Sequence, residues 1–246
     1  MDRMIYVAAS GVRATMQRQE VLANNLANVN TPGFRAETVA FRVAPVAGDG
    51  LPTRAFVAES TTGADFTPGV ITTTGRTQDV AVQGRGFFAL QGTDGVEGYS
   101  RNGAFTISDA GQLVTHAGQP VLGDGGPISV PPGSVLSIAA DGSISATPAG
   151  GSKTVAPVAR LKLVNPPAGD LARGVDGLFR MKDGSEAPPD VKVKVVAGAI
   201  EGSNVNAVEA MVGMITLARQ FEMQMKLMQT ADAAARKGAQ LLGSAG

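Results

Sequence analysis

The chain has 246 residues, in which 21 Lys and Arg balance 21 Asp and Glu, and it contains no Cys, no Trp and one His. A net charge of zero provides no field that would attract nucleic acid or an anionic membrane, so we expect neither as a partner. Without cysteine, neither a disulfide framework nor a thiolate metal site can form.

The start of the chain argues against a targeting segment. Its first apolar run, Met4 to Ala9, is shorter than the roughly 7 to 15 residues of a secretory h-region, which predicts that no signal peptide is cleaved. No apolar stretch approaches the roughly 18 to 20 residues of a membrane span, so we expect no direct membrane insertion.

Proline and glycine divide the chain. All 14 prolines lie between Pro32 and Pro189, and 26 of the 32 glycines lie between Gly48 and Gly202. Because these residues break helices and favour turns, the ends can form long helices while the middle resembles a β domain. We predict an α+β fold, with long N- and C-terminal helices forming a coiled-coil-like layer and a mainly antiparallel β-rich central domain. The expected segments are an N-terminal helix with an Asn-rich motif in 1–34, an extended connecting segment in 35–75, a β-rich domain in 76–200 and a C-terminal helix in 201–246.

The N-terminal helix is predicted from residues at alternating spacings of three and four, which is typical of a coiled-coil seam. Thr15 and Gln19 weaken this seam mid-way, and the turn around Pro32 and Gly33 ends the helix. The seam positions are Ile5, Ala8, Val12, Thr15, Gln19, Leu22, Leu26 and Val29.

Four asparagines, Asn24, Asn25, Asn28 and Asn30, occupy seven positions at the end of this helix. Asparagine is a poor helix-interior residue because its amide competes for backbone hydrogen bonds. The cluster therefore indicates either a fraying helix end or side chains that bond to a neighbouring subunit and set its register.

The middle of the chain is predicted to form short strands joined by turns. Residues 35–75 lack clear periodicity, whereas strands are expected from Asp79 onward and at Val191–Val195, which alternates cleanly. The other expected strands are Val80–Val82, Phe87–Leu90, Ala104–Ile107, Leu113–Thr115, Val135–Ile138 and Val158–Val164. Hairpin-type turn dipeptides occur at Asp94-Gly95, Asn102-Gly103, Asp124-Gly125, Asp141-Gly142 and Asp183-Gly184.

The C-terminal helix is predicted to begin with a capping box of Asn206 and Glu209, with Ser203 or Asn204 as equally suitable caps, and to continue to about Leu242. Met214 and Leu217 widen its apolar stripe, so we expect more than one apolar neighbour for this helix. The stripe itself consists of Val208, Met211, Ile215, Ala218, Phe221, Met225 and Met228.

The sequence contains no convincing catalytic, cofactor or metal site. His116 is the only histidine, so a zinc pair is excluded and a catalytic triad would have to use it. The Asp-Gly pairs lack the spacing of a calcium loop, and Gly84-Arg85-Gly86 precedes a strand where a dinucleotide loop requires a helix. We therefore expect no enzyme activity and no cofactor.

Several segments together resemble the flagellar rod and hook family. The stretch Ala23–Phe34 contains the Ala-Asn-Asn-Leu-Ala-Asn core followed by Gly-Phe, and Glu201–Lys226 resembles the closing helix of the family. Three further segments of this chain resemble landmarks of the family's β domain, namely Gly84–Phe88, Tyr99–Phe105 and Gly118–Gly123. Thr31–Arg35, the ending Phe221–Met225 and the length look more like the proximal rod than like the distal rod or the hook, which remain the alternatives.

The resemblance implies a structural subunit that self-assembles and co-assembles with other rod subunits into a hollow helical shaft. Such a shaft crosses the periplasm and transmits torque, and its subunits are exported through the flagellar type III export apparatus. We expect the terminal helices to be frayed in the exported monomer and to fold on incorporation. The residues expected to pack then against Val208, Ile215 and partner helices are Ile5, Val12, Leu22 and Leu26. The expected assembly interface consists of Ile5, Val12, Leu22, Asn24, Asn25, Leu26, Asn28, Asn30, Pro32, Gly33, Phe34, Val208, Met211, Ile215, Ala218, Phe221, Met225 and Met228.

Two other classes of protein are alternatives to a structural subunit. A hydrolase in the β domain is disfavoured by the single histidine and by the lack of a grouped acid, base and nucleophile. A secreted β-domain binding module with a helical stalk fits the composition as well as a rod subunit does, and only the family resemblance separates the two.

Overall fold

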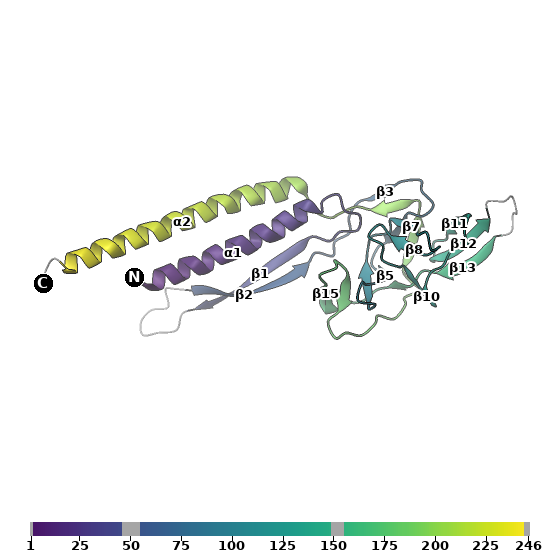
Figure 1. Ribbon diagram of the computed structural model, residues 1–246, viewed down its shortest axis with the longest axis horizontal. Coiled ribbons are helices and arrows are strands. Elements are labelled where there is room, and N and C mark those ends of the chain that lie inside the picture. Colours follow the sequence, from purple (N-terminus) through teal and green to yellow (C-terminus); the bar gives the residue numbers. More distant parts are fainter. Residues whose placement is uncertain (1, 46–54, 149–154, 244–246) are drawn as a thin grey trace. The chain divides into compact units, whose positions relative to one another are not determined.

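The computed structural model describes residues 2–45, 55–148 and 155–243. The chain folds into two compact units (Figure 1). The helical unit comprises the described residues of 1–27, 37–65 and 206–246, and the β unit comprises those of 28–36 and 66–205. Two terminal helices and many antiparallel strands confirm the predicted α+β class.

The helical unit contains α1 (Asp2–Ala27) and α2 (Ala207–Gly243). The predicted cap of α2 forms, because the Asn206 Oδ1 accepts hydrogen bonds from the backbone N–H of Val208 at 3.0 Å and of Glu209 at 3.3 Å. With 37 residues, α2 is about 55 Å long. None of the described helices is long and apolar enough to span a membrane.

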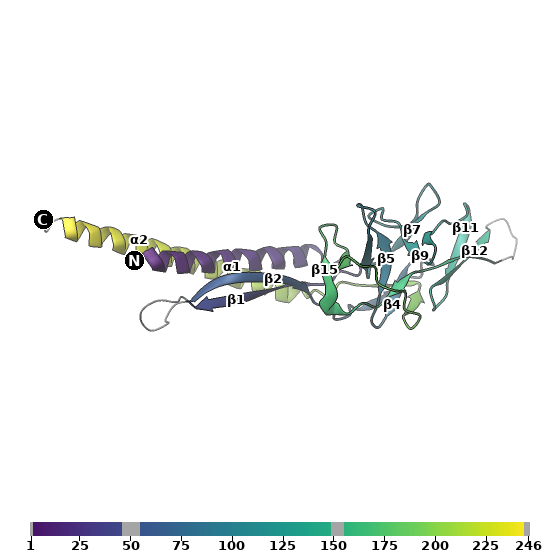
Figure 2. The same ribbon diagram turned by 90° about the horizontal axis from the view of Figure 1, so that it is seen from below.

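The two helices pack side by side and antiparallel (Figures 1 and 2). Gly213 lies opposite Leu22, and a Cβ added to Gly213 would lie 2.8 Å from the Leu22 Cδ1. Gly11 lies opposite Gln224, where an added Cβ would lie 3.4 Å from the amide nitrogen. Glycine inside a helix lowers its intrinsic stability, but at Gly213 it allows α1 to approach closely.

The other face of α1 is covered by a hairpin of β1 (Glu37–Pro45) and β2 (Ala55–Ala64). The strands pair antiparallel from Glu37 opposite Ala64 to Pro45 opposite Ala55, with a register shift between Arg42 and Val43. The Arg18 guanidinium lies 4.8 Å from the centre of the Phe41 ring. The segment predicted as extended connecting chain is thus extended, but its two halves pair with each other and dock on α1.

The β unit is built from short strands, and every strand pair found in its described residues is antiparallel. Its largest sheet has the order β14-β5-β6-β16-β15, a second has the order β11-β12-β13, and the remaining strands form the pairs β17-β4, β18-β3, β7-β8 and β10-β9. The strands are β3 (Ile71–Thr73), β4 (Val80–Gln83), β5 (Phe87–Gln91), β6 (Glu97–Ser100), β7 (Phe105–Ile107), β8 (Leu113–Thr115), β9 (Leu122–Gly123), β10 (Gly126–Pro127), β11 (Ser134–Ile138), β12 (Ser143–Pro148), β13 (Ala156–Arg160), β14 (Leu163–Val164), β15 (Leu171–Arg173), β16 (Phe179–Met181), β17 (Lys194–Ala197) and β18 (Ala199–Glu201), with a 3-10 turn at Ala168–Asp170.

Two predicted strands differ from the structure. The segment Val158–Val164 is split, because its first part belongs to β13 and pairs with β12 whereas its end forms β14 and pairs with β5. The strand predicted at Val191–Val195 begins only at Lys194, because a turn precedes it in which the Asp190 Oδ1 accepts the N–H of Lys192 at 2.9 Å.

The hairpin-type dipeptides also differ among themselves. The Asp-Gly glycines Gly95, Gly142 and Gly184 have φ values of 79°, 85° and 74°, as turn glycines should. Asn102-Gly103 is not such a turn. A Cβ on Gly103 would lie 1.7 Å from the Val80 carbonyl oxygen, so this glycine is required by the close contact of the β6–β7 connection with β4.

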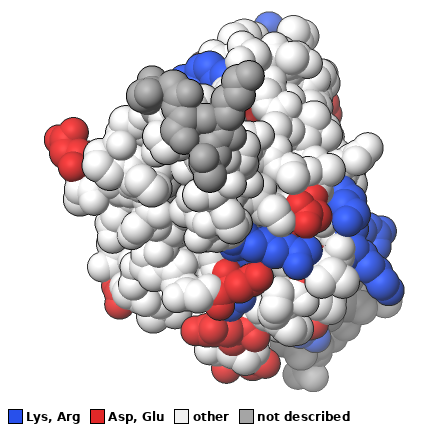
Figure 3. All heavy atoms as spheres, turned by 90° about the vertical axis from the view of Figure 1, so that its right-hand side faces the viewer, with Lys and Arg blue, Asp and Glu red and all other residues white. Residues whose placement is uncertain are grey.

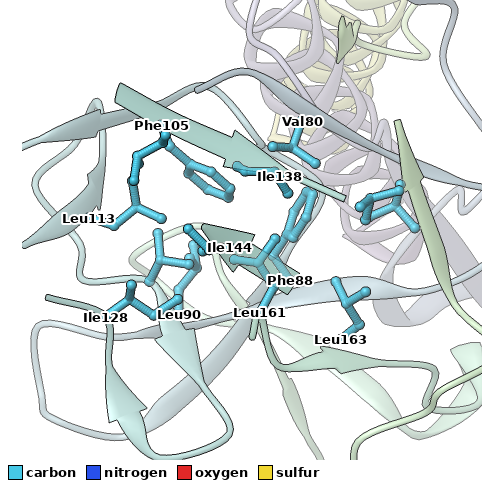
Figure 4. Packing of buried hydrophobic residues seen from close by; sticks show 14 of the residues in the cluster. Val80, Phe88, Leu90, Phe105, Leu113, Ile128, Ile138, Ile144, Leu161 and Leu163 are labelled. Carbon is cyan, nitrogen blue, oxygen red and sulfur yellow. The ribbon is translucent and has the colours of Figure 1, made fainter. Parts of the chain in front are cut away.

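The core of the β unit is mainly aliphatic (Figure 4). Its two inner aromatic residues, Phe88 and Phe105, pack edge to face with their ring centres 5.2 Å apart. Around them lie Val80, Leu90, Leu113, Ile128, Ile138, Ile144, Leu161 and Leu163. The low aromatic content of the sequence is therefore compatible with a continuous core.

Candidate assembly interface

The seam between α1 and α2 contains part of the predicted interface. Val12, Leu22 and Leu26 of α1 are half-buried, and so are Phe221, Met225 and Met228 of α2. Ala210 and Leu217 are buried in α2. Ile5 lies in α1, but its side chain is outside the described residues.

A second apolar surface lies on the first turns of α2 and is open to solvent. This outer stripe consists of Val208, Met211, Val212 and Ile215, which are 70%, 50%, 58% and 56% exposed. Leu217 follows Val208 by nine residues, which is two and a half helical turns, so the outer stripe and the seam lie on opposite faces. Ala218, at the edge of the stripe, is also exposed.

The position of the outer stripe corrects one detail of the expected packing. Val208 and Ile215 were expected to pack against α1, but α1 instead contacts the face that carries Gly213. The reason is steric, since the seam face has glycine and alanine in its first turns and admits Leu22 closely. Of the two apolar faces that the structure gives to the first turns of α2, α1 therefore covers only one.

The asparagine cluster bonds largely within the chain. Asn25 is buried, and its Nδ2 donates to the Glu37 carbonyl at 2.9 Å while its Oδ1 accepts the Glu37 N–H at 2.7 Å. The Asn24 Nδ2 donates to the Glu37 carboxylate at 2.9 Å. Two asparagines thus hold the start of the β1–β2 hairpin, an arrangement that the sequence did not suggest.

The remaining motif residues belong to the β unit. Asn28 is half-buried and its Oδ1 accepts the Thr31 hydroxyl at 3.1 Å, whereas Asn30 is exposed. Gly33 is buried with φ of 68°, and its N–H donates to the Glu201 carbonyl at 2.7 Å. Pro32 beside it is half-buried.

Phe34 is held by an arginine of the β unit. The Arg173 guanidinium lies 4.6 Å from the centre of the Phe34 ring and 5.0 Å from that of Phe179. An arginine between two aromatic faces is a favourable arrangement, because each ring presents its negative face to the cation. Phe34 therefore has an intramolecular packing role whatever its role in assembly.

A buried ionic group next to this motif was missed by sequence reasoning. Glu201 is fully buried and receives the Arg35 Nη2 at 2.6 Å and the Arg101 Nε at 2.7 Å. The N–H of Gly69 also donates to it, at 2.8 Å. We call Arg35, Arg101 and Glu201 the Glu201 clasp. No local spacing signals it, because its members are brought together only by the fold.

Backbone carbonyls accept the remaining hydrogen bonds of Arg101. Arg101 also donates to the carbonyls of Gly86 at 2.6 Å and Gly84 at 2.8 Å. Burial lowers the pKa of the Arg101 guanidinium, and the Glu201 charge acts in the opposite direction. The clasp joins the segment after α1 to the segment before α2, so its chemistry is structural.

The β unit contains a cleft with charged side chains in its lining. It has a volume of about 560 Å³ and is lined by residues that include Glu97, Lys162 and Glu186. The Lys162 Nζ donates to Glu97 at 2.6 Å and lies 3.5 Å from Glu186. Burial alone would lower the pKa of Lys162, but the two carboxylates outweigh it and raise this pKa. A lysine held in its charged form is poorly suited to act as a base or nucleophile.

The rest of the described surface offers no clearer chemical site. His116 is exposed in its turn, and no three metal-binding side chains lie close enough together among the described residues to hold an ion. Figure 3 shows acidic and basic side chains interspersed on one face of the β unit. The exposed apolar surface of α2 therefore remains the leading candidate for function.

Comparison with known proteins separates a rod subunit from a binding module. Three family models match: "Flagella basal body rod protein" at residues 5–35, "Flagellar hook protein FlgE/F/G D1 domain" at 81–146 and "Flagellar basal body rod FlgEFG protein C-terminal" at 196–241. The flagellar basal-body rod protein FlgF of Escherichia coli (strain K12) is 49% identical over 98% of this chain and 99% of its own length. The chain belongs to the flagellar basal-body rod protein family.

Other members of the rod family support the same assignment. FlgF of Salmonella typhimurium is 48% identical over 98% of this chain, and FlgF of Caulobacter vibrioides is 32% identical over 99% of it. The predicted resemblance to the proximal rod protein is confirmed. Rod proteins are structural subunits of the flagellar basal body and not enzymes, so the chain is a structural protein of the periplasmic rod.

The matched segments coincide with the elements described above. The first model covers most of α1 and the asparagine motif, the second covers β4 to β12, and the third covers the end of β17 and most of α2. The matched segments therefore include most of both helices and positions 35 and 201 of the Glu201 clasp.

Proposed function

We propose that the chain self-assembles and co-assembles with related rod subunits through its terminal helices, and that the outer stripe of α2 is the main contact between subunits. In this proposal the helices form a coiled-coil-like layer that lines a hollow shaft and carries torque as mechanical load. The observation that supports it is the exposure of four large apolar side chains on a helix face opposite the seam.

Covering the outer stripe with a partner would be energetically favourable. Burial of apolar surface stabilises by about 25 cal/mol per Å², so a partner that covers four such side chains gains several kcal/mol. Arg219, Glu222 and Lys226 are exposed farther along α2, and they limit the apolar stripe to the first turns. An open helical array requires contacts between unlike patches, and such a stripe can bind a different surface of the next subunit.

The proposal extends to the parts of the chain and to its export. Residues 1–34 and 201–246 would supply the assembling helices, 76–200 the β-rich domain, and 35–75 the connecting segment between them. The asparagine motif would contribute through Asn30 and the exposed side of Asn24. Delivery would use the flagellar export apparatus.

The test places a charge on the outer stripe. We expect Ile215→Asp to abolish incorporation into basal bodies and motility in a strain that lacks the wild-type chain, because a carboxylate in an apolar contact is costly. The matched control is Gln17→Asp, which adds the same charge at an exposed and already polar position of α1. Normal rods containing Ile215→Asp would refute the proposed contact.

A further inference from the structure

The antiparallel pairing of α1 and α2 raises a question of register. The seam on α2 has an approximate seven-residue repeat, with Ala210, Leu217 and Gln224 on one line. A slide of α1 by seven residues would keep apolar residues facing apolar residues, and methionine adapts easily to altered packing. Apolar burial alone therefore specifies the register only weakly.

One polar contact interrupts the apolar seam. Thr15 is 5% exposed, and its hydroxyl shares one proton between the Gly11 carbonyl at 3.0 Å and the Gln224 Oε1 at 3.3 Å. Gln224 is half-buried, and its amide lies beside Gly11. We infer that Thr15 and Gln224 form a polar lock that determines the register of α1 against α2.

The alternative registers show why the lock is selective. A slide by seven residues would place Thr15 opposite Leu217 in one direction and Ala231 in the other, and neither side chain can accept a hydrogen bond. It would also move the Gln224 amide against Leu22 or Ala8, where its hydrogen bond is lost. The Thr15 hydroxyl keeps its bond to the Gly11 carbonyl in every register, so the selection comes from the Gln224 amide oxygen, which meets this hydroxyl only in the native register.

A steric fit acts in the same register. Leu22 lies against Gly213, where no Cβ is present, and a slide by seven residues would bring Gln220 or Asn206 to Leu22 instead. The Thr15–Gln224 lock and the Leu22–Gly213 fit are separated by about two helical turns, so they define one axial position together. This inference concerns pairing within the chain and does not depend on the proposed contact between subunits.

The absence of cysteine allows a direct test by disulfide cross-linking in the purified full-length chain. The pair Leu22→Cys and Gly213→Cys reports the native register, and the pair Leu22→Cys and Gln220→Cys reports the slipped one. Intramolecular cross-links are quantified by peptide mass spectrometry at low protein concentration. Both pairs replace Leu22 and therefore remove the Leu22–Gly213 fit, so the ratio reports the lock alone, and with Thr15 and Gln224 intact we expect the first cross-link to predominate.

The second step of the test removes the hydrogen bond between Thr15 and Gln224 by substitution. We expect Gln224→Leu and Thr15→Val each to reduce the ratio of native to slipped cross-link by about three- to tenfold, the range that one hydrogen bond contributes to an equilibrium. Helix content by circular dichroism should be retained, because leucine suits the seam. The matched control Gln19→Leu makes the same exchange at an exposed side chain near Thr15 and should leave the ratio unchanged.

Three results would overturn the inference. The ratio could remain unchanged in both lock variants, which would assign the register to the apolar residues. Both cross-links could disappear together, which would show that the contact holds the helices together without choosing their register. The native cross-link could fail to form in the parent chain, which would mean that the pairing itself is absent.

Discussion

Glu201 is fully buried between Arg35 and Arg101, which precede it in the chain by 166 and 100 residues. A buried carboxylate between two guanidinium groups is stable only while all three charges remain together. The Nε and Nη1 of Arg35 find no acceptor among the described residues, so this arginine depends on Glu201 for compensation. The clasp should therefore be highly sensitive to loss of the carboxylate.

We expect Glu201→Gln to reduce the free energy of unfolding by about 3 to 5 kcal/mol, because it leaves buried cations uncompensated. Urea denaturation of the full chain, followed by circular dichroism, measures this change. Glu186→Gln is the control, since that side chain is 69% exposed and its loss should cost less than about 1 kcal/mol. A similar small effect of Glu201→Gln would contradict the role of the clasp.

A second ionic group lies between two turns with matching sequences, Gly92–Val96 and Gly174–Leu178. The Arg180 guanidinium donates to Asp176 at 2.9 and 2.6 Å and to Asp94 at 3.1 Å. Added Cβ atoms on Gly92 and Gly174 would both lie 2.4 Å from its nitrogens. A side chain at either position would therefore displace the arginine from its present place.

The hydrogen bonds from Arg180 lower the pKa of Asp176 in the folded chain. A lowered folded-state pKa contributes stability above the unfolded value of about 3.9, and this contribution disappears as the pH falls through the folded value. We expect the difference in Tm between the wild type and Asp176→Asn to be largest near about pH 6 and to shrink below about pH 4. A difference in Tm that is independent of pH would exclude this linkage.

At the scale of elements, the β1–β2 hairpin depends on its contacts with α1. A two-stranded hairpin is marginally stable in water by itself. Asn25 pairs with both the N–H and the carbonyl of Glu37, as a peptide group of a third strand would. The asparagine motif therefore fastens the hairpin where it begins.

We expect Asn25→Ala to loosen the hairpin at a cost of about 1 to 3 kcal/mol, because the backbone groups of Glu37 lose buried partners. Hydrogen exchange of the β1 amides, compared with that of the β5 amides, separates this local effect from global unfolding. Asn30→Ala removes an exposed amide of the same motif and should change neither set. Unaltered exchange in β1 of the Asn25 variant would show that other contacts dock the hairpin.

At the scale of the whole molecule, the two units differ in how much apolar surface they bury. Among the described residues, the helical unit contributes only Ala210 and Leu217 to the buried apolar side chains, whereas the β unit has a continuous core. With so little apolar surface buried, the gain from burial can exceed the conformational entropy cost of ordering two long helices only by a small margin. The helical unit should therefore be the less stable of the two.

This difference leads to a prediction about assembly. We expect the paired helices α1 and α2 to open often in the dilute monomer, so that their amides exchange hydrogen much faster than those of the β5 and β6 core, and to become protected in isolated rods. Hydrogen exchange with mass spectrometry measures both states. Strong protection of both helices in the dilute monomer would contradict the expectation that assembly orders them.

The sequence by itself determined the features that depend on local chemistry. The distribution of Pro and Gly located the helices, Asn206 and Glu209 marked the start of α2, and the motifs indicated the rod family. These signals are readable because helix caps, turns and amphipathic periodicity arise from residues a few positions apart. The wide apolar stripe of α2 could likewise be predicted from the sequence. The sequence did not indicate which side of this helix α1 would cover.

Only the tertiary structure decided the contacts between distant residues. The Glu201 clasp, the Asn25–Glu37 pairing and the docking of Leu22 on Gly213 join segments for which no local period indicates a partner. The strand predicted at Val158–Val164 was split for the same reason, because its two ends found different partners. A side chain's partner depends on how the whole chain closes, and this is a long-range property that periodicity does not encode.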